Sequence, residues 1–189
     1  MKSQEIIKRA IKILLNPITG WQENQVKEFS YRNLINPIFI ITLIILFSSR
    51  LVGNTISKFA TIDFIYILSF SFAMLIVDII YFFLLITILN SLSPYYNISA
   101  GKNKISFFIY TCLLPFYFSI IIYNLFPALY FINIIIIYSF LVFYWGLKNY
   151  LQVKHKDALI IFISFSLIIL GSYLVLNFLF VRPFFDFIF

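Results

Sequence analysis

The sequence has little charge, since only 11% of its 189 residues are Asp, Glu, Lys or Arg. A soluble domain carries about 25% charged residues. This chain is instead 62% hydrophobic and 21% aromatic. A domain of this length buries only part of its surface and could not hide so much apolar area from water. The composition excludes a soluble globular domain and predicts that lipid is the main solvent.

Residue types that build catalytic and metal sites are also scarce. The single cysteine, Cys112, excludes a disulfide framework and a cysteine zinc cluster. The single histidine, His155, excludes the paired histidines of a zinc protease. Asp63 and Asp78 fall on one predicted helix about 22 Å apart and cannot form an aspartyl protease dyad. With five scattered glycines, the chain also has no phosphate-binding loop. We therefore predict a protein that is not an enzyme and has no cofactor or metal.

Long apolar runs are what the sequence does have. About 20 apolar residues cross a hydrocarbon core of ~30 Å, and five runs of 19 to 28 residues cover 109 of the 189 positions. The runs are 34–52, 62–89, 105–123, 128–146 and 158–181. The predicted fold class is all-α, a polytopic membrane protein whose transmembrane domain, 34–189, has five transmembrane helices. The second run has no Gly or Pro and is expected to be one tilted helix.

Lys and Arg are unevenly divided between the two sides of these runs. With the N-terminus inside, eleven lie on inner segments and three on outer ones, namely Arg50, Lys58 and Arg182. This positive-inside bias predicts an N-terminus inside and, after five spans, a C-terminus outside. Because the aromatic residues lie inside apolar runs rather than on a basic surface, we expect no nucleic-acid partner.

The first 33 residues are expected to form a cytosolic or interfacial amphipathic segment. Lys8, Arg9 and Lys12 share a narrow arc of a helical wheel, and apolar residues fill most of the rest. Asn16-Pro17 predicts the end of this helix. A basic stripe backed by an apolar face suits contact with an anionic leaflet of the lipid bilayer. The alternative is a helix that packs on the protein's own cytosolic face or on a partner.

Asp78 lies near the middle of the second run, where an acid costs about 2.5 to 3.5 kcal/mol to insert. We expect it to face the bundle interior without a Lys or Arg at its depth, since Arg50 is expected near the outer interface, paired with Asp63 or snorkelling. Its candidate partners are Ser71 and Tyr81 on its own helix and the hydroxyls of Tyr110, Thr111 and Tyr138. Two interpretations stay open: a proton-linked or polar-substrate site, and a buried acid that fixes helix packing.

Other residues in the runs have simpler expected roles. Pro115 should kink the third run and free the carbonyl of Thr111, which either lines a cavity or leaves a fixed bend. Asn133 and Asn177 are expected to hydrogen-bond between helices. Trp21 and Trp145 are expected to anchor the chain at the membrane interface.

Several short motifs occur in a characteristic order. They are Leu14-Leu15-Asn16-Pro17-Ile18-Thr19-Gly20-Trp21, Tyr110-Thr111-Cys112-Leu113-Leu114-Pro115, and Tyr144-Trp145-Gly146-Leu147 followed by His155-Lys156 and Ala158. This order resembles that of Yip1-family membrane proteins and covers almost the whole chain. Acidic and glycine motifs of the eukaryotic trafficking members are not evident, which indicates a prokaryotic branch. The resemblance implies a multi-pass helical protein without catalytic residues. Eukaryotic relatives contact small GTPases through a long cytosolic region that this N-terminus lacks.

The sequence therefore predicts a non-enzymatic, Yip1-like protein of the bacterial cytoplasmic (inner) membrane that organises or recruits membrane-protein partners. The alternative is a small channel or proton-linked transporter, as a homo-oligomer, with a pathway near Asp78 and Pro115. A water-reachable cavity around Asp78 would favour transport. A dry, hydrogen-bonded Asp78 would favour the organising function.

Overall fold

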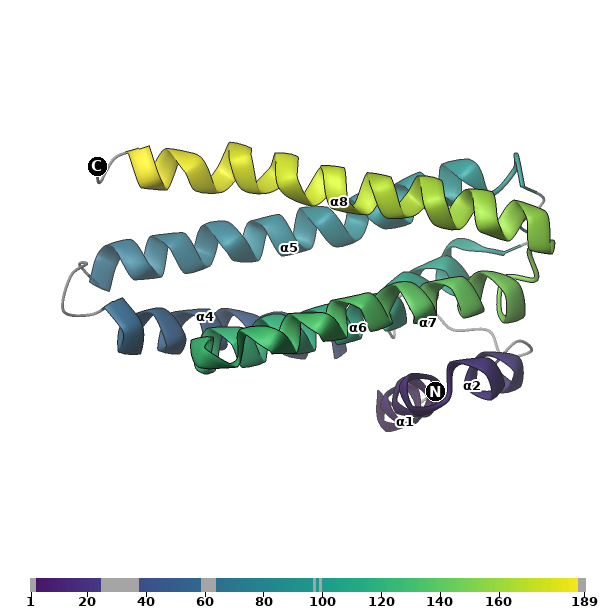
Figure 1. The fold of residues 1–189 in the computed structure, drawn as a ribbon, viewed down its shortest axis with the longest axis horizontal. Coiled ribbons are helices and arrows are strands. Elements are labelled where there is room, and N and C mark those ends of the chain that lie inside the picture. Colours follow the sequence, from purple (N-terminus) through teal and green to yellow (C-terminus); the bar gives the residue numbers. More distant parts are fainter. Residues whose placement is uncertain (1–2, 25–37, 59–63, 97, 99, 187–189) are drawn as a thin grey trace.

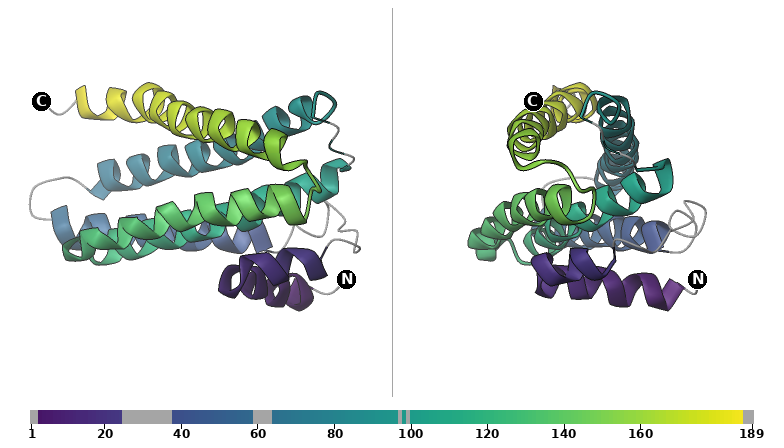
Figure 2. Two further views of the ribbon diagram at one scale, coloured as in Figure 1. Left: turned by 45° about the vertical axis from the view of Figure 1, so that its right-hand side comes forward. Right: turned by 90° about the vertical axis from the view of Figure 1, so that its right-hand side faces the viewer.

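The computed structural model describes residues 3–24, 38–58, 64–96, 98 and 100–186, and all regular structure in these ranges is helical. The elements are α1 (Ser3–Leu15), α2 (Pro17–Glu23), α4 (Ile40–Lys58), α5 (Phe64–Leu92), α6 (Lys102–Leu125), the 3₁₀ helix η2 (Pro127–Ile134), α7 (Ile135–Asn149) and α8 (His155–Asp186). Helices α4 to α8 form an elongated bundle, and α1 and α2 lie crosswise against its side near one end (Figure 1, Figure 2).

Four segments are long and apolar enough to cross a membrane: Phe64–Leu92, Lys102–Leu125, Pro127–Asn149 and His155–Leu176. The all-helical prediction is thus confirmed for the described residues, which are consistent with an integral multi-pass membrane protein. The first predicted run, 34–52, corresponds to α4, whose apolar part, Ile40–Ile56, is shorter than these four segments. Positions 34–37 of that run lie outside the described residues, and both the count of five spans and the domain boundary at 33/34 stay predictions.

The hairpin between the third and fourth runs is as tight as expected. Only Phe126 separates α6 from η2, and its N–H donates to the Ile122 carbonyl at 2.8 Å. The fourth run is not a uniform α-helix, however, because it begins as η2, where Leu129 leaves helical geometry (φ −88°, ψ 42°). Pro127 lacks a backbone N–H, and no η2 residue is buried. Neither backbone nor packing therefore enforces α-helical geometry before Ile135.

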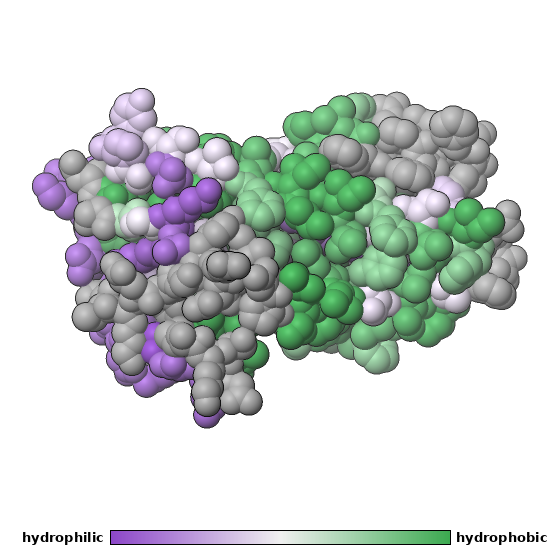
Figure 3. Space-filling model, turned by 180° about the vertical axis from the view of Figure 1, so that it is seen from behind, coloured by the Kyte–Doolittle hydropathy of each residue, from purple (hydrophilic) through white to green (hydrophobic). Residues whose placement is uncertain are grey.

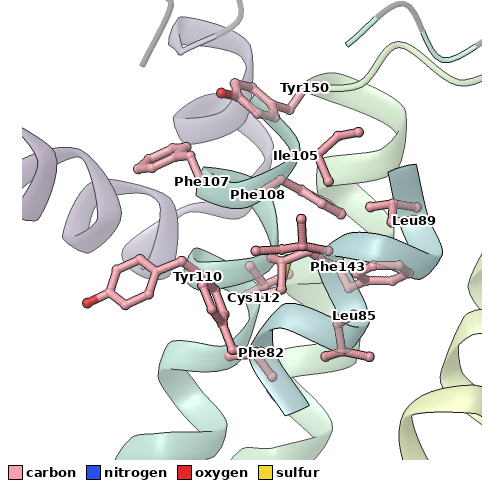
Figure 4. Close-up of a cluster of buried hydrophobic side chains, with 14 of the residues drawn as sticks. Phe82, Leu85, Leu89, Ile105, Phe107, Phe108, Tyr110, Cys112, Phe143 and Tyr150 are labelled. Atoms are coloured by element: carbon pink, nitrogen blue, oxygen red, sulfur yellow. The ribbon is translucent and has the colours of Figure 1, made fainter. Parts of the chain in front are cut away.

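Helix α6 lies at the centre of the bundle and contacts α4, α5, α7 and η2. In the apolar 18-residue stretch of α6, 67% of the residues are buried within the protein. The corresponding share is 50% for α5 and only 11% for each of the last two segments. The labelled core side chains in Figure 4 are Phe82, Leu85 and Leu89 of α5, Ile105, Phe107, Phe108, Tyr110 and Cys112 of α6, Phe143 of α7, and Tyr150. The last two spanning segments therefore form the edge of the bundle.

The backbone of α4 lies directly against the backbone at the C-terminal end of α6. A Cβ at Gly53 would lie 1.9 Å from the Asn124 carbonyl oxygen, so only glycine fits there. One turn earlier, the hydroxyl of Ser49 accepts a hydrogen bond from the Asn124 side-chain amide at 3.3 Å. This close contact fixes where α4 lies along the bundle.

Trp21 fastens the N-terminal segment to the bundle. Its side chain is fully buried, and its indole N–H donates to the Val142 carbonyl at 3.1 Å. Its ring centroid lies 5.5 Å from that of Phe108 and 4.9 Å from that of Tyr150. The expectation of a lipid-interface anchor at Trp21 is therefore wrong, because the ring packs on protein rather than on headgroups.

The motif that precedes Trp21 shapes the turn between α1 and α2. Asn16 caps α2 by accepting a hydrogen bond from the Thr19 N–H at 3.3 Å, and Pro17 occupies the first helical position. A Cβ at Gly20 would lie 2.6 Å from the Ile13 Cα, so glycine lets the two helices touch. As predicted, α1 ends immediately before Asn16-Pro17.

Gly146 provides the space on α7 for this contact. A Cβ there would lie 2.4 Å from Phe108 Cε2 and 2.9 Å from Trp21 Cε2. We expect Gly146→Ala to cost about 1 to 3 kcal/mol of folding free energy through overpacking. The control is Gly171→Ala, where a Cβ meets nothing within 4 Å. Thermal unfolding of both purified variants tests this. Equal midpoints for the two would contradict the close contact.

Candidate functional site

The centre of the candidate site is an ion pair between Arg50 of α4 and Asp78 of α5. Arg50 Nη1 pairs with Asp78 Oδ2, and Arg50 Nη2 donates to Asp78 Oδ1 at 3.2 Å. Only 3% of the Arg50 side chain and 1% of the Asp78 side chain are exposed. A guanidinium fork that meets both carboxylate oxygens is among the stronger hydrogen-bonded arrangements in proteins. The pair therefore joins α4 to α5 at a point that water does not reach.

This pairing corrects the sequence-based expectation that no Lys or Arg lies at the depth of Asp78. The expectation for Arg50, a position at the outer interface, was wrong as well. The first apolar run was expected to end at position 52, but α4 continues to Lys58. Arg50 consequently lies eight residues, or about 12 Å, from the end of its helix. The extra helical turns move its side chain into the interior.

The other predicted partners of Asp78 make their hydrogen bonds elsewhere. Ser71 Oγ donates to the Ile67 carbonyl on its own helix at 2.8 Å. The Tyr81 hydroxyl donates to the Ile169 carbonyl of α8 at 3.3 Å, and that of Tyr110 bonds Thr42 Oγ1 of α4 at 3.0 Å. The remaining two bonds run from Thr111 to the Phe107 carbonyl and from Tyr138 to the Leu14 carbonyl. The three tyrosine hydroxyls therefore connect helices, and Ser71 and Thr111 bond within their own helices.

Tyr117 of α6 is the residue near the pair that the sequence analysis missed. Its side chain is 1% exposed, and its hydroxyl has no hydrogen-bond partner among the described residues. Both Arg50 and Asp78 lie within electrostatic range of it. The signal in the sequence was its spacing of seven residues from Tyr110, which puts both tyrosines on one face of the helix. The site is thus two neutralising charges and a buried phenol.

The three predicted membrane-surface cations do not act alike. Lys8 is exposed, Arg9 pairs with Glu5 one turn away, and Lys12 Nζ lies 2.5 Å from Glu23 Oε2 of α2. An exposed pair such as that of Lys12 and Glu23 is worth only about 0.2 to 1 kcal/mol. Lys12 can therefore exchange its partner for another anion.

Arg9 differs from the two lysines because it also faces Tyr150. Burial raises the pKa of the Tyr150 hydroxyl, and the positive charge of Arg9 opposes that rise only in part. The phenol therefore stays protonated. Arg9 thus belongs to the contact between α1 and the bundle.

Helix α1 satisfies both interpretations of the N-terminal segment in part. Ile6, Ala10 and Ile13 are buried against the rest of the protein. Ile7 and Ile11, by contrast, are 41% and 49% exposed on an adjoining face. The buried stripe of α1 therefore packs on the protein itself. The exposed stripe, with Ile7 and Ile11, is able to contact lipid or another apolar partner.

Pro115 lies inside α6, which continues through it from Lys102 to Leu125. It lines a groove between α1, α6 and α7. Asn133 makes the expected interhelical bond, accepting from Ser119 Oγ at 3.1 Å. Asp63 and the side chains of Asn177 and Arg182 lie outside the described part of the chain.

Comparison with known proteins gives no relative for this arrangement. No family model, curated protein or solved structure matches the chain. Within the described ranges, no group of three or more His, Cys, Asp or Glu residues could hold a metal ion. The physical properties of the ion pair and of the surfaces are therefore the basis for assigning a role.

The ion pair predicts a strongly coupled double-mutant cycle. Arg50→Met or Asp78→Leu alone leaves one buried charge without a counterion and should cost about 3 to 5 kcal/mol. The double variant removes both charges and should regain most of that loss. Thermal unfolding of the four proteins in one detergent measures the coupling.

The exposed pair of Lys12 and Glu23 supplies the control cycle. Lys12→Met with Glu23→Leu should show a coupling below about 1 kcal/mol, because both side chains are more than half exposed. Additive losses in the Arg50 and Asp78 cycle would contradict the buried pair. A weaker coupling there than in the control cycle would contradict it equally.

Proposed function

We propose that this protein is a non-enzymatic, multi-pass membrane protein that organises or recruits other membrane proteins. The closed Arg50–Asp78 pair is the observation that carries the proposal. Its two charges cancel, its side chains are 3% and 1% exposed, and its hydrogen bonds join two helices. A carboxylate held this way serves packing and does not offer protons or ligands a binding site.

The proposed membrane arrangement has five spans, with α4 as the first. Placing Arg50 inside α4 leaves Lys58 and Arg182 as the outer cations, against eleven inner ones, which strengthens the positive-inside bias. Figure 3 supports the same orientation, because hydrophilic residues gather at the end of the molecule where α1 and α2 lie. We place that end, with the N-terminus, on the inner side of a bacterial cytoplasmic membrane. The resemblance to the prokaryotic Yip1 branch is part of this proposal.

Helices α7 and α8 provide the proposed surface for partners. In the apolar stretch of each of these two segments, only 11% of the residues are buried within the protein. Apolar side chains stand out along both helices, among them Ile137 at 67%, Leu167 at 66% and Leu174 at 68% exposure. A partner's apolar helix can pack on such a face within the bilayer, where close fit rather than water exclusion drives association.

Transport through Asp78 is less well supported. A proton pathway needs a carboxylate that water or a relay group reaches, and the Asp78 oxygens are instead taken by Arg50. Pro115 lines a groove with α1, not the ion pair. The two residues named for a pathway therefore belong to different parts of the bundle.

Recruitment predicts a discrete crosslinked partner on α8. A photoreactive amino acid at Leu167 should give one or a few protein adducts in intact membranes. The same group at Ile65 of α5, which is 76% exposed, serves as the matched control and should give lipid adducts alone. Gel analysis and mass spectrometry of the adducts provide the measurement.

Two results would contradict this function. Identical adducts at Leu167 and Ile65 would remove the special role of α8. Proton flux into liposomes that contain the purified protein, lost in Asp78→Asn while the fold persists, would support the transporter instead.

The proposed orientation predicts opposite labelling of two positions. In a Cys112→Ser background, Tyr130→Cys lies at the η2 end, where the native side chain is 73% exposed, and Lys156→Cys lies near the start of α8. A membrane-impermeant maleimide should label Tyr130→Cys in intact cells with the outer membrane opened. Lys156→Cys should react only after the inner membrane is permeabilised. The reverse pattern would overturn the orientation.

A further inference from the structure

An apolar groove of about 430 Å³ lies between α1, α6 and α7. Ile7, Ile11 and Leu14 of α1 form one wall, and Pro115, Phe118 and Ile135 lie on the opposite side. We propose that this groove holds one acyl chain of an anionic phospholipid, whose phosphate lies beside Lys8. The inference rests on the proposed position of α1 at the inner membrane surface and is independent of partner recruitment.

The lining chemistry selects a hydrocarbon rather than a polar ligand. Tyr110 and Tyr138 contribute the two hydroxyls of the lining. The Tyr110 hydroxyl bonds Thr42 at 3.0 Å, and the Tyr138 hydroxyl donates to the Leu14 carbonyl at 2.6 Å. A polar ligand would lose its hydration without gaining a new partner, at a cost of about 1 to 3 kcal/mol per group. An acyl chain needs no such partner.

The groove is held open by the contacts that position α1. The hydrogen bond from Tyr138 fixes the end of α1 on α7, and buried Ile6 and Ile13 fix a neighbouring stripe of α1 on the bundle. Trp21 holds the following helix at the same end. Helix α1 therefore cannot simply slide to fill the space, and the site is preformed, as ligand sites generally are.

The rim of the groove has the charge that a phospholipid requires. Lys8 is three residues from Ile11 and four from Lys12, so it lies beside the groove wall on the helix surface. Leu15, 82% exposed, extends the apolar wall on the same side. Along α6 the lining runs from Tyr110 to Phe118, about 12 Å further from the inner end. The headgroup therefore lies at the cationic end and the tail points into the bilayer.

Native mass spectrometry of the purified full chain tests the inference. The probes are phosphatidylglycerol and phosphatidylcholine with identical acyl chains. Ile11→Trp fills the groove from its half-exposed wall and should reduce binding of both lipids at least about tenfold. The matched control, Ile18→Trp on α2, replaces a similarly exposed side chain (40% against 49%) that does not line the groove, and should bind as wild type.

The charge component is tested separately. Lys8→Gln should reduce the preference for phosphatidylglycerol over phosphatidylcholine by about fivefold, as expected for one lysine at an anionic surface. Lys156→Gln should leave the preference unchanged. If Ile11→Trp does not fold, Ile7→Trp, which fills the same wall, takes its place.

Three results would overturn the inference. The first is unchanged lipid binding in a folded Ile11→Trp variant. The second is retention of oleate but not phosphatidylglycerol, which would identify a fatty-acid site. The third is a dimer in the wild type that Ile11→Trp abolishes, which would assign the groove to a second copy. Each result is read on the purified chain, so a failure here is distinct from a failure of the crosslinking experiment.

Discussion

The packing of the bundle depends on two opposite charges that are costly to bury in lipid. Each of Arg50 and Asp78 alone would disfavour insertion, but together they neutralise one another and allow only one alignment of α4 against α5. Apolar side chains do not impose such a choice in a bilayer, because lipid tails satisfy them equally well. Other interhelical hydrogen bonds add further specificity to the packing. Among them are those from Tyr81 to α8, from Tyr110 to α4 and from Tyr138 to α1.

The N-terminal segment depends on a different kind of contact. Gly20 lets α2 touch α1, and Gly146 leaves space on α7 for the Trp21 ring. The indole N–H donates to the Val142 carbonyl of α7. Two sequence motifs more than 120 residues apart thus meet in one contact. Their order along the chain has a physical meaning, because one supplies a large ring and the other the space for it. Helix α1 is positioned as a result, although it does not span the membrane.

The sequence predicts the helical segments well and their partners poorly. Apolar run length is a local property, so α5, α6, α7 and α8 were found near their actual positions. Pairing is not local: Arg50 was misplaced because polar residues such as Asn54 and Thr55 hid the last turns of α4. Their side chains bond the carbonyls of Arg50 and Leu51 one turn back, which lets the helix continue. The burial of Trp21 depends on a gap at Gly146 that neither segment reveals alone.

The lengths of the helices have a consequence for the surrounding lipid. Helices α5 and α8 pack together and have 29 and 32 residues, about 44 and 48 Å, whereas α4 has 19 residues, about 28 Å. A hydrocarbon core of ~30 Å matches the length of α4, whereas α5 and α8 are longer than the core. The helices on one flank of the protein are therefore longer than the core. They can fit it by tilting, by protruding at one end or by locally thickening the bilayer, each at a modest cost.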